Sequence, residues 1–266
     1  MDFLKRTVAP IPKEAWDELD EEARKALACA LSARKVVDMA GPLGWNYCAH
    51  SEGQLNLVDG TPVDGVNYGI RQVTPLTEIR VPFTMPICAL DDIARGRKTV
   101  DHTPVQEAAR KAALFEDTAI YFGMENTGIT GLIPAAENKA LNIKLEDDAI
   151  VETIVLAQQM LRDKNIEGPF ALVASYPLYN KIMSAVKAYP LLHRVERLVE
   201  KIVLSPQADA CMLISTRGSD NELVIGQDFS LGYMSSTATE ATFYITETLT
   251  FKCYTTQAVV PLCPVK

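Results

Sequence analysis

The sequence predicts a mixed α+β fold, because it contains one long helical pattern, one long strand pattern and a section that alternates between the two. Apolar side chains recur every three to four positions over residues 105–123, which is typical of a helix. Apolar and polar side chains alternate over residues 243–253, which is typical of a strand, although Glu247 interrupts the apolar face. Residues 147–215 contain helical patterns separated by short apolar runs, and they indicate an α/β section.

The composition narrows the class of protein. The chain has 266 residues, of which 48% are hydrophobic and 23% charged, and a net charge of −8. Lys and Arg form no cluster, so no nucleic-acid partner is expected. No apolar run is long enough to span a membrane, and the first residues do not resemble a signal peptide. The six cysteines contain no CxxC pair, so reduced thiols and a cytoplasmic location are expected.

The flanking residues predict the ends of the two longest helices. The N-terminal helix is expected to begin at Pro12 and to carry Arg34 and Lys35 at its end, where basic residues complement the helix dipole. Its apolar stripe comprises Trp16, Leu19, Ala23, Ala26, Leu27, Ala30 and Leu31. The helix at 105–123 is expected to start with a capping box formed by Thr103 and Gln106.

Residues 50–80 differ from the rest of the chain because glycines and prolines separate short apolar pairs. This pattern predicts a hairpin or extended arm, and Asp59-Gly60 is its best candidate for the turn. An arm with so few apolar residues cannot form a core of its own. It is expected to need a partner.

No pattern in the sequence nominates a catalytic or metal-binding residue. His193, Glu196 and Glu200 share a helical face, but a solvated surface explains them better than a metal site. The sequence contains no GxSxG, Walker or GxGxxG motif. A catalytic set drawn from distant residues would leave no such signature, so a stand-alone enzyme stays open as an alternative.

Two late segments are the most distinctive: residues 225–233, with the sequence IGQDFSLGY, and residues 245–251, with the sequence ITETLTF. The other characteristic positions are residues 1–6, 9–10, 16, 20, 23–24, 34–38, 41–45, 115–117, 128–132, 168–169 and 189–190. With these segments in order over nearly its whole length, the chain resembles the encapsulin shell family, which is also described as linocin-type bacteriocins.

The resemblance implies the Hong Kong 97-type phage major capsid fold, with a peripheral domain, an axial domain and an extended loop. The implied parts are 1–49 (N-terminal helix and start of the peripheral domain), 50–79 (extended loop), 80–130 (peripheral domain with its spine helix), 131–222 (axial domain) and 223–266 (last peripheral strands). The implied function is a non-enzymatic shell subunit that forms an icosahedral cage of about sixty copies. A phage major capsid protein is the main alternative, since it would share the fold.

The resemblance also implies a cargo protein, either a ferritin-like iron-storage protein or a peroxidase, that binds inside the shell through a C-terminal targeting peptide. The positions implied for that peptide are Leu31, Arg34, Val37, Asp38, Ser230 and Leu231. Apolar walls would take aliphatic side chains, while Arg34 and Asp38 would fix the direction of the peptide. The alternative is that Leu31 and Val37 only close the helix onto its own core.

Two further features follow from the resemblance. The implied pore-lining residues are Ser184, Ala185, Val186, Lys187, Ala188 and Tyr189. Some members bind flavin by stacking it on a Trp within the segment equivalent to residues 83–88. This sequence has Cys88 at the position aligned with that Trp, so no flavin is expected by that mode.

Overall fold

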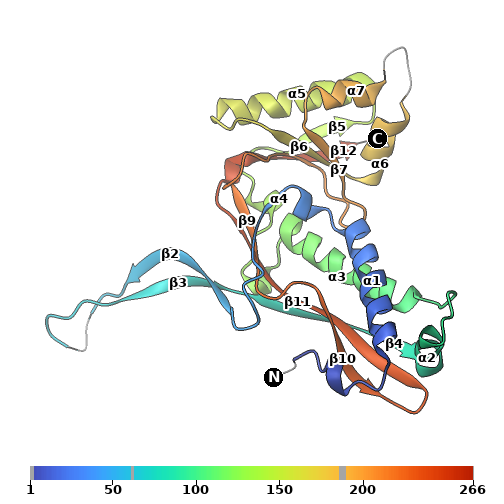
Figure 1. Cartoon of the computed structure of the whole chain (residues 1–266). Coiled ribbons are helices and arrows are strands. Elements are labelled where there is room, and N and C mark those ends of the chain that lie inside the picture. The colour runs from blue at the N-terminus through green and yellow to red at the C-terminus, as the bar shows by residue number, and fades with distance from the viewer. Residues whose placement is uncertain (1–2, 61–62, 186–189, 266) are drawn as a thin grey trace.

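The computed structural model describes residues 3–60, 63–185 and 190–265. The chain forms two bodies, each built on its own sheet, and a long hairpin that projects to one side (Figure 1). Helices and strands both contribute to each body, which confirms the mixed α+β prediction. The short 3₁₀ helices are η1 (Arg6–Val8), η2 (Ala33–Lys35), η3 (Glu125–Thr127) and η4 (Thr256–Ala258). The shortest α-helix is α4 (Leu132–Ala135).

The central strand of the first sheet is β11, the strand predicted from its alternating pattern. The strands of this sheet are β1 (Asp38–Ala40), β4 (Thr77–Pro86), β9 (Asn221–Ile225), β10 (Ser230–Ser236) and β11 (Glu240–Cys253). β4 pairs along one edge of β11, whereas β10 and β9 follow one another along the other edge. Residues 226–229 join β9 to β10 and therefore cross that edge beside Glu247 and Thr248.

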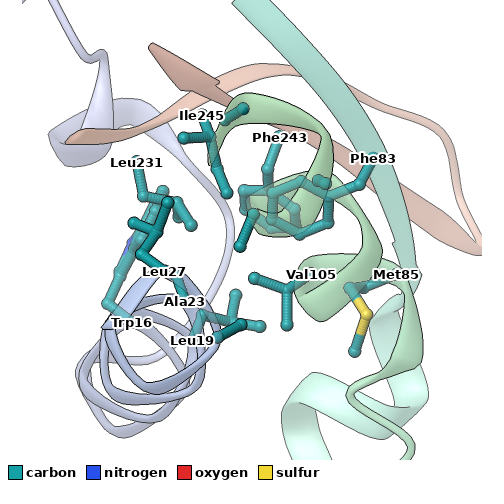
Figure 2. Packing of buried hydrophobic residues seen from close by; sticks show 14 of the residues in the cluster. Trp16, Leu19, Ala23, Leu27, Phe83, Met85, Val105, Leu231, Phe243 and Ile245 are labelled. Atoms are coloured by element: carbon teal, nitrogen blue, oxygen red, sulfur yellow. The ribbon is translucent and has the colours of Figure 1, made fainter. Parts of the chain in front are cut away.

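Two long helices pack on the first sheet: α1 (Lys13–Ala30) and α3 (Thr103–Phe122). The apolar stripe of α1 faces α3 and the sheet, and Trp16 meets Phe243 edge to face with ring centroids 5.3 Å apart (Figure 2). The short helix α2 (Ile87–Ala94) completes this core with Leu90 and Ile93. Burial of this stripe, rather than helix propensity, accounts for most of the stability of α1.

The apolar face of β11 is shared between two cores. Phe243 and Ile245 belong to the core beneath α1, whereas Leu249 and Phe251 belong to a second core that reaches the other sheet. Glu247 stands between these two pairs and is fully buried. The interruption seen in the sequence therefore marks the boundary between the two cores.

The second sheet has the strand order β5-β12-β8-β6-β7. Its strands are β5 (Leu141–Lys144), β6 (Phe170–Ala174), β7 (Lys201–Leu204), β8 (Met212–Ser215) and β12 (Val259–Val265). Its helices are α5 (Asp147–Asp163), α6 (Tyr176–Ser184) and α7 (Leu191–Glu196). Alternate residues of β6 point to opposite faces, so Val173 joins the core shared with the first body and Leu172 joins the core under α5.

β12 corrects one expected boundary. Residues 223–266 were expected to stay with the first sheet, but β12 pairs with β5 and β8 in the second. The turn η4 carries the chain from β11 to this sheet, and Val259, Val260 and Leu262 are buried there. The apolar residues of this last segment therefore pack in the body built on the second sheet.

The projecting hairpin consists of β2 (Ala49–Leu57) and β3 (Gly69–Pro75), and it matches the predicted arm. The connection covers residues 58–68, so Asp59-Gly60 lies within a longer loop and does not form a two-residue turn. At the root of the hairpin, Lys252 Nζ of β11 lies 2.6 Å from Glu52 Oε1. The arm is thus anchored at its base, while most of its described residues are exposed.

Two helix ends differ from the expectation because tertiary contacts override the local signals. α1 ends at Ala30 and not at Lys35, since the buried Asp117 carboxylate accepts hydrogen bonds from the backbone of Ser32 (3.1 Å) and Ala33 (2.9 Å). In α3, Gln106 Nε2 donates to Glu22 Oε2 of α1 (2.9 Å) and does not complete a capping box. Thr103 is the first residue of the helix rather than its N-cap.

Candidate functional site

A groove of about 740 Å³ lies between α1, the N-terminal segment and the start of β10. Its size falls within the range of small-ligand pockets, about 300–1,000 Å³. The lining residues are Leu4, Arg6, Asp17, Asp20, Glu21, Ala23, Arg24, Leu27, Ala28, Leu31, Arg34, Asp228, Phe229, Ser230, Leu231 and Ile245. Apolar side chains from α1 and β10 form its base, and charged side chains surround them.

One wall of the groove consists of the segment that joins β9 to β10 and the first two residues of β10, and Arg34 holds this wall in place. Arg34 Nη2 donates to Asp228 Oδ1 (2.9 Å), and the guanidinium lies over the Phe229 ring, 4.8 Å from its centroid. The backbone nitrogen of Phe229 donates to the same Asp228 oxygen (2.8 Å), and Ser230 Oγ donates to the Asp228 carbonyl (2.8 Å). We call residues 227–231 the groove wall.

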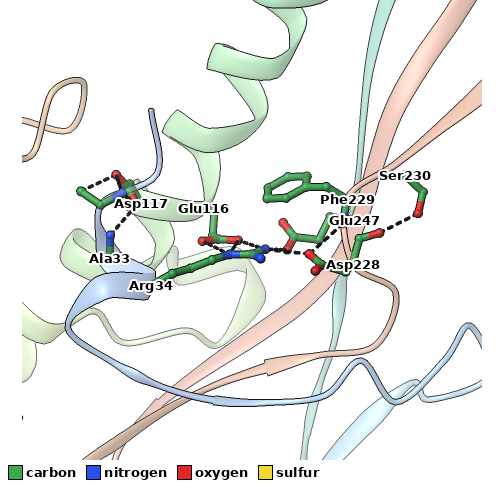
Figure 3. A network of polar contacts seen from close by, with 9 residues as sticks. Ala33, Arg34, Glu116, Asp117, Asp228, Phe229, Ser230 and Glu247 are labelled. Atoms are coloured by element: carbon green, nitrogen blue, oxygen red, sulfur yellow. Dashed lines mark hydrogen bonds and ion pairs between the residues drawn. The ribbon is translucent and has the colours of Figure 1, made fainter. Parts of the chain in front are cut away.

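Arg34 also bonds two buried glutamates behind the wall (Figure 3). Its Nη2 lies 2.6 Å from Glu116 Oε2 of α3 and 2.7 Å from Glu247 Oε1 of β11. Both glutamates are 0% exposed, whereas Asp228 is 43% exposed. Three carboxylates thus surround one guanidinium, and only Asp228 has ready access to water.

The electrostatics of this cluster follow from burial. Burial, and next the charge of Glu116, raises the pKa of Glu247 well above its ordinary range. Burial lowers the pKa of Arg34, but hydrogen bonds and the charges of its carboxylate partners outweigh that effect and raise it. Glu247 Oε2 is buried without a hydrogen-bond partner among the described residues, which also disfavours its ionised form.

The comparisons with known proteins identify the family. Residues 1–250 match the Linocin_M18 family, described as encapsulating protein for peroxidase. The chain is 40% identical over 270 residues to the type 1 encapsulin shell protein of Rhodospirillum rubrum, covering 98% of this chain and 96% of that protein. The chain belongs to the encapsulin shell family. Shell proteins of Mycolicibacterium paratuberculosis and Mycobacterium tuberculosis are 37% and 36% identical, each over 98% of this chain and 99% of the relative.

Solved structures confirm the capsid fold expected for an encapsulin. A virus-like particle from Pyrococcus furiosus aligns with a TM-score of 0.65 at 14% identity, covering 92% of this chain and 98% of that one. A chain from Mycobacterium phage Bobi aligns with a TM-score of 0.57 at 13% identity, covering 89% and 91%. At these identities the likeness concerns the fold alone. The sequence matches therefore favour the encapsulin assignment over the phage capsid alternative.

Within this encapsulin chain, four of the six residues expected at the cargo site line the groove: Leu31, Arg34, Ser230 and Leu231. The other two lie elsewhere. Val37 packs in the core shared by the two sheets, and Asp38 Oδ2 accepts from the backbone of Ser219 (2.5 Å) beside a separate small cavity. Arg34 differs from the expectation, because carboxylates already bind its guanidinium and its side chain is only 16% exposed.

Several groove residues were missed by sequence reasoning. Asp20, Arg24, Leu27 and Ala28 continue the face of α1 that leads to Leu31, but only Leu27 was assigned a role, as part of the buried stripe. Arg6 lines the far side and bonds Asp20 (2.6 Å). The helical periodicity of α1 could have indicated these positions, because a groove beside a helix begins where its buried apolar stripe meets its exposed face.

Most of the expected pore residues cannot be placed. Ser184 is exposed at the end of α6 and Ala185 follows it, whereas Val186, Lys187, Ala188 and Tyr189 lie outside the described residues. Cys88 is exposed in the first turn of α2. Its side chain offers no aromatic platform for a flavin ring, so the expectation of no flavin by that mode stays a prediction.

The remaining sequence candidates form no centre in the part of the chain that the structure describes. His193 Nδ1 lies 3.1 Å from Glu196 Oε2 on an exposed helix face. Across residues 3–60, 63–185 and 190–265, no group of three or more His, Cys, Asp and Glu residues has the geometry of a metal site. None of the helices described there has the length and apolar character needed to cross a bilayer.

Proposed function

We propose that this encapsulin chain assembles with copies of itself into a closed icosahedral shell of about sixty subunits and that the groove receives the C-terminal targeting peptide of a cargo enzyme. The capsid fold and the family membership support the shell. The cargo would be a ferritin-like iron-storage protein or a peroxidase. The cytoplasm is the proposed location, and the six unpaired cysteines are compatible with it.

The observation that carries the proposal is the apolar surface of the projecting hairpin. Its exposed apolar residues are Leu55, Leu57, Val63, Val66, Tyr68, Ile70 and Val73. Leu57 lies opposite Gly69 and Ile70 opposite Asn56, so apolar side chains stand on both faces of the ribbon. A ribbon that is apolar on both faces is stabilised when a neighbouring subunit covers it.

The groove supports the cargo half of the proposal by its shape and its mixed chemistry. Leu27, Leu31 and Leu231 offer apolar contacts at its base, while Asp17 and Arg24 stand at its rim. An extended peptide with aliphatic side chains fits such a site, because apolar pockets give affinity and flanking charges set the direction. Asp38 and Val37 stay candidates for a more distant part of the same peptide.

The first experiment is negative-stain electron microscopy of the purified chain, with its mass measured by light scattering. Uniform hollow particles are the expected result. A monomer or dimer under gentle conditions would overturn the shell proposal.

The expectation that residues 184–189 line a pore has its own test. Replacing Lys187 by Glu is expected to change the rate at which charged substrates reach an encapsulated enzyme. An unchanged rate would exclude a charge role for Lys187.

A further inference from the structure

The contacts of Arg34 Nη2 create a competition between three carboxylates. This nitrogen carries two hydrogens, yet Glu116, Asp228 and Glu247 all place an oxygen within 2.9 Å of it. Two of these oxygens receive an N–H bond at any moment and the third is held mainly by charge. How firmly Asp228 is held therefore depends on the charge of the two glutamates behind it.

The charged groups around Glu247 leave one cation for three acids. η2 contributes Arg34, α3 contributes Glu116, and the groove wall contributes Asp228. On β4, Ile79 stands opposite Glu247, so the ion pair between Glu78 and Arg80 belongs to the other face of the sheet.

One further acid lies near this cluster on α3. Asp117, next to Glu116, accepts hydrogen bonds from the η2 backbone and adds negative charge on that side. An ionised Glu247 consequently increases a surplus of negative charge in a dry environment.

Asp228 is the carboxylate that can leave this cluster. Glu116 and Glu247 are fully buried, whereas Asp228 is nearly half exposed at the groove. Its departure would remove the acceptor of the Phe229 amide and separate the Phe229 ring from the guanidinium. The groove wall would then lose its attachment to η2.

We propose that Glu247 is a positioning residue for the groove: in its neutral form it leaves Arg34 free to hold Asp228 and the groove wall, and on ionisation it releases that wall. The burial that raises the pKa of Glu247 is compatible with a neutral side chain near neutral pH. Since the neutral form is the holding form, the wall is ordered at lower pH and loosens as the pH rises through the pKa of Glu247.

The coupling between Glu247 and the wall is independent of what the groove binds. That the wall faces a cargo peptide rests on the proposed function, and in that case cargo affinity falls as the pH rises. The test therefore measures the wall itself, in assembled wild-type protein, by hydrogen–deuterium exchange of the segment 227–231 between about pH 6 and about pH 10, with exchange times corrected for the intrinsic pH dependence.

The expected result is a loss of protection in this segment of at most about tenfold per pH unit once Glu247 ionises. Glu247→Gln, which fixes a neutral side chain of the same shape, is expected to keep the wall protected at high pH. Glu240→Gln removes an exposed carboxylate at the start of the same strand, and this control is expected to keep the wild-type profile. Asp228→Asn removes the charged partner of Arg34 in the wall and is expected to give low protection at every pH.

Two results would overturn the proposal: a wild-type profile that does not change with pH, or a Glu247→Gln profile with the wild-type slope. The cargo assignment is tested separately, by loading a tagged ferritin-like protein or peroxidase that carries its C-terminal peptide. A pH-dependent wall in shells that load no cargo would refute the proposed function and leave the role of Glu247 intact. Shells that load cargo but have a wall insensitive to Glu247 would support the proposed function and refute the role of Glu247.

Discussion

The side chains of Arg34 and Glu247 meet at 2.7 Å although 213 positions separate them in the sequence. The contact joins η2, just after the N-terminal helix, to the central strand of the first sheet, at the point where the two cores of that strand meet. It also lies directly behind the groove wall. A single hydrogen bond thus links the packing of the body built on the first sheet to the shape of the candidate binding site.

Removing the guanidinium is expected to be strongly destabilising. Arg34→Met keeps the apolar stem but leaves Glu116 and Glu247 buried without a cation, and the free energy of unfolding should fall by about 3–5 kcal/mol. Arg24→Met is the control, because Arg24 is 76% exposed and its pair with Glu21 should contribute less than about 1 kcal/mol. Urea unfolding of both variants in the same assembly state measures the difference, and equal losses would contradict the expectation.

Asp117 is expected to make stability depend on pH. Burial raises its pKa to about 6, against the hydrogen bonds from Ser32 and Ala33 that lower it. Because the folded pKa lies above the ordinary 3.8, this contribution to stability is complete at low pH and is lost as the pH rises through about 6.

A pKa of about 6 in place of 3.8 for Asp117 corresponds to about 3 kcal/mol in the free energy of unfolding. The free energy of unfolding of the wild type, measured from about pH 4 to about pH 8, should therefore fall more steeply than that of Asp117→Asn. Identical slopes would mean that another group is responsible, whatever the absolute stability of the variant.

A bulky charged residue in the groove should block cargo loading without harming the fold. Ala28 is exposed on α1 and lines the groove, so Ala28→Arg fills the site but removes no core side chain. Ala94→Arg makes the same change at an exposed position at the end of α2. Co-purification of tagged cargo should be lost in the first variant and retained in the second, with empty shells forming in both. Normal loading of Ala28→Arg would place the cargo site elsewhere.

The hairpin variants separate assembly from folding. Leu57 is 75% exposed in the single chain, so Leu57→Asp should leave the subunit folded but prevent its arm from being buried against a neighbour. Gln54→Asp adds the same charge at an exposed polar position of the same strand. Light scattering should show small species for the first variant and shells for the second. Intact shells from Leu57→Asp would show that this part of the arm stays in water.

Periodicity predicted the elements whose apolar faces are buried in a simple way. The helix α3 and the strand β11 were expected at nearly their observed positions, because their apolar faces are buried along most of their length. Helix ends were predicted less well. The end of α1 is set by Asp117, which lies more than 80 residues away and therefore leaves no local signal.

The candidate site shows the same limit. Leu31 and Leu231 were expected at a groove by resemblance, and the structure places both there. Glu247 was visible only as an acid that interrupts an apolar face, and its partner could not be deduced from any spacing rule. Long-range contacts of this kind depend on how three separate elements are packed, which the order of residues alone does not specify.

The place of β12 in the second sheet has a consequence during protein synthesis. β5 pairs with β12 and, among the described residues, with no other strand, so it can join the sheet only after residues 259–265 have left the ribosome. The hairpin at residues 49–75, with its exposed apolar side chains, leaves the ribosome much earlier. A nascent chain therefore exposes its arm while the second sheet is still incomplete. A subunit in which both the arm and the second sheet are formed exists only once translation has passed β12.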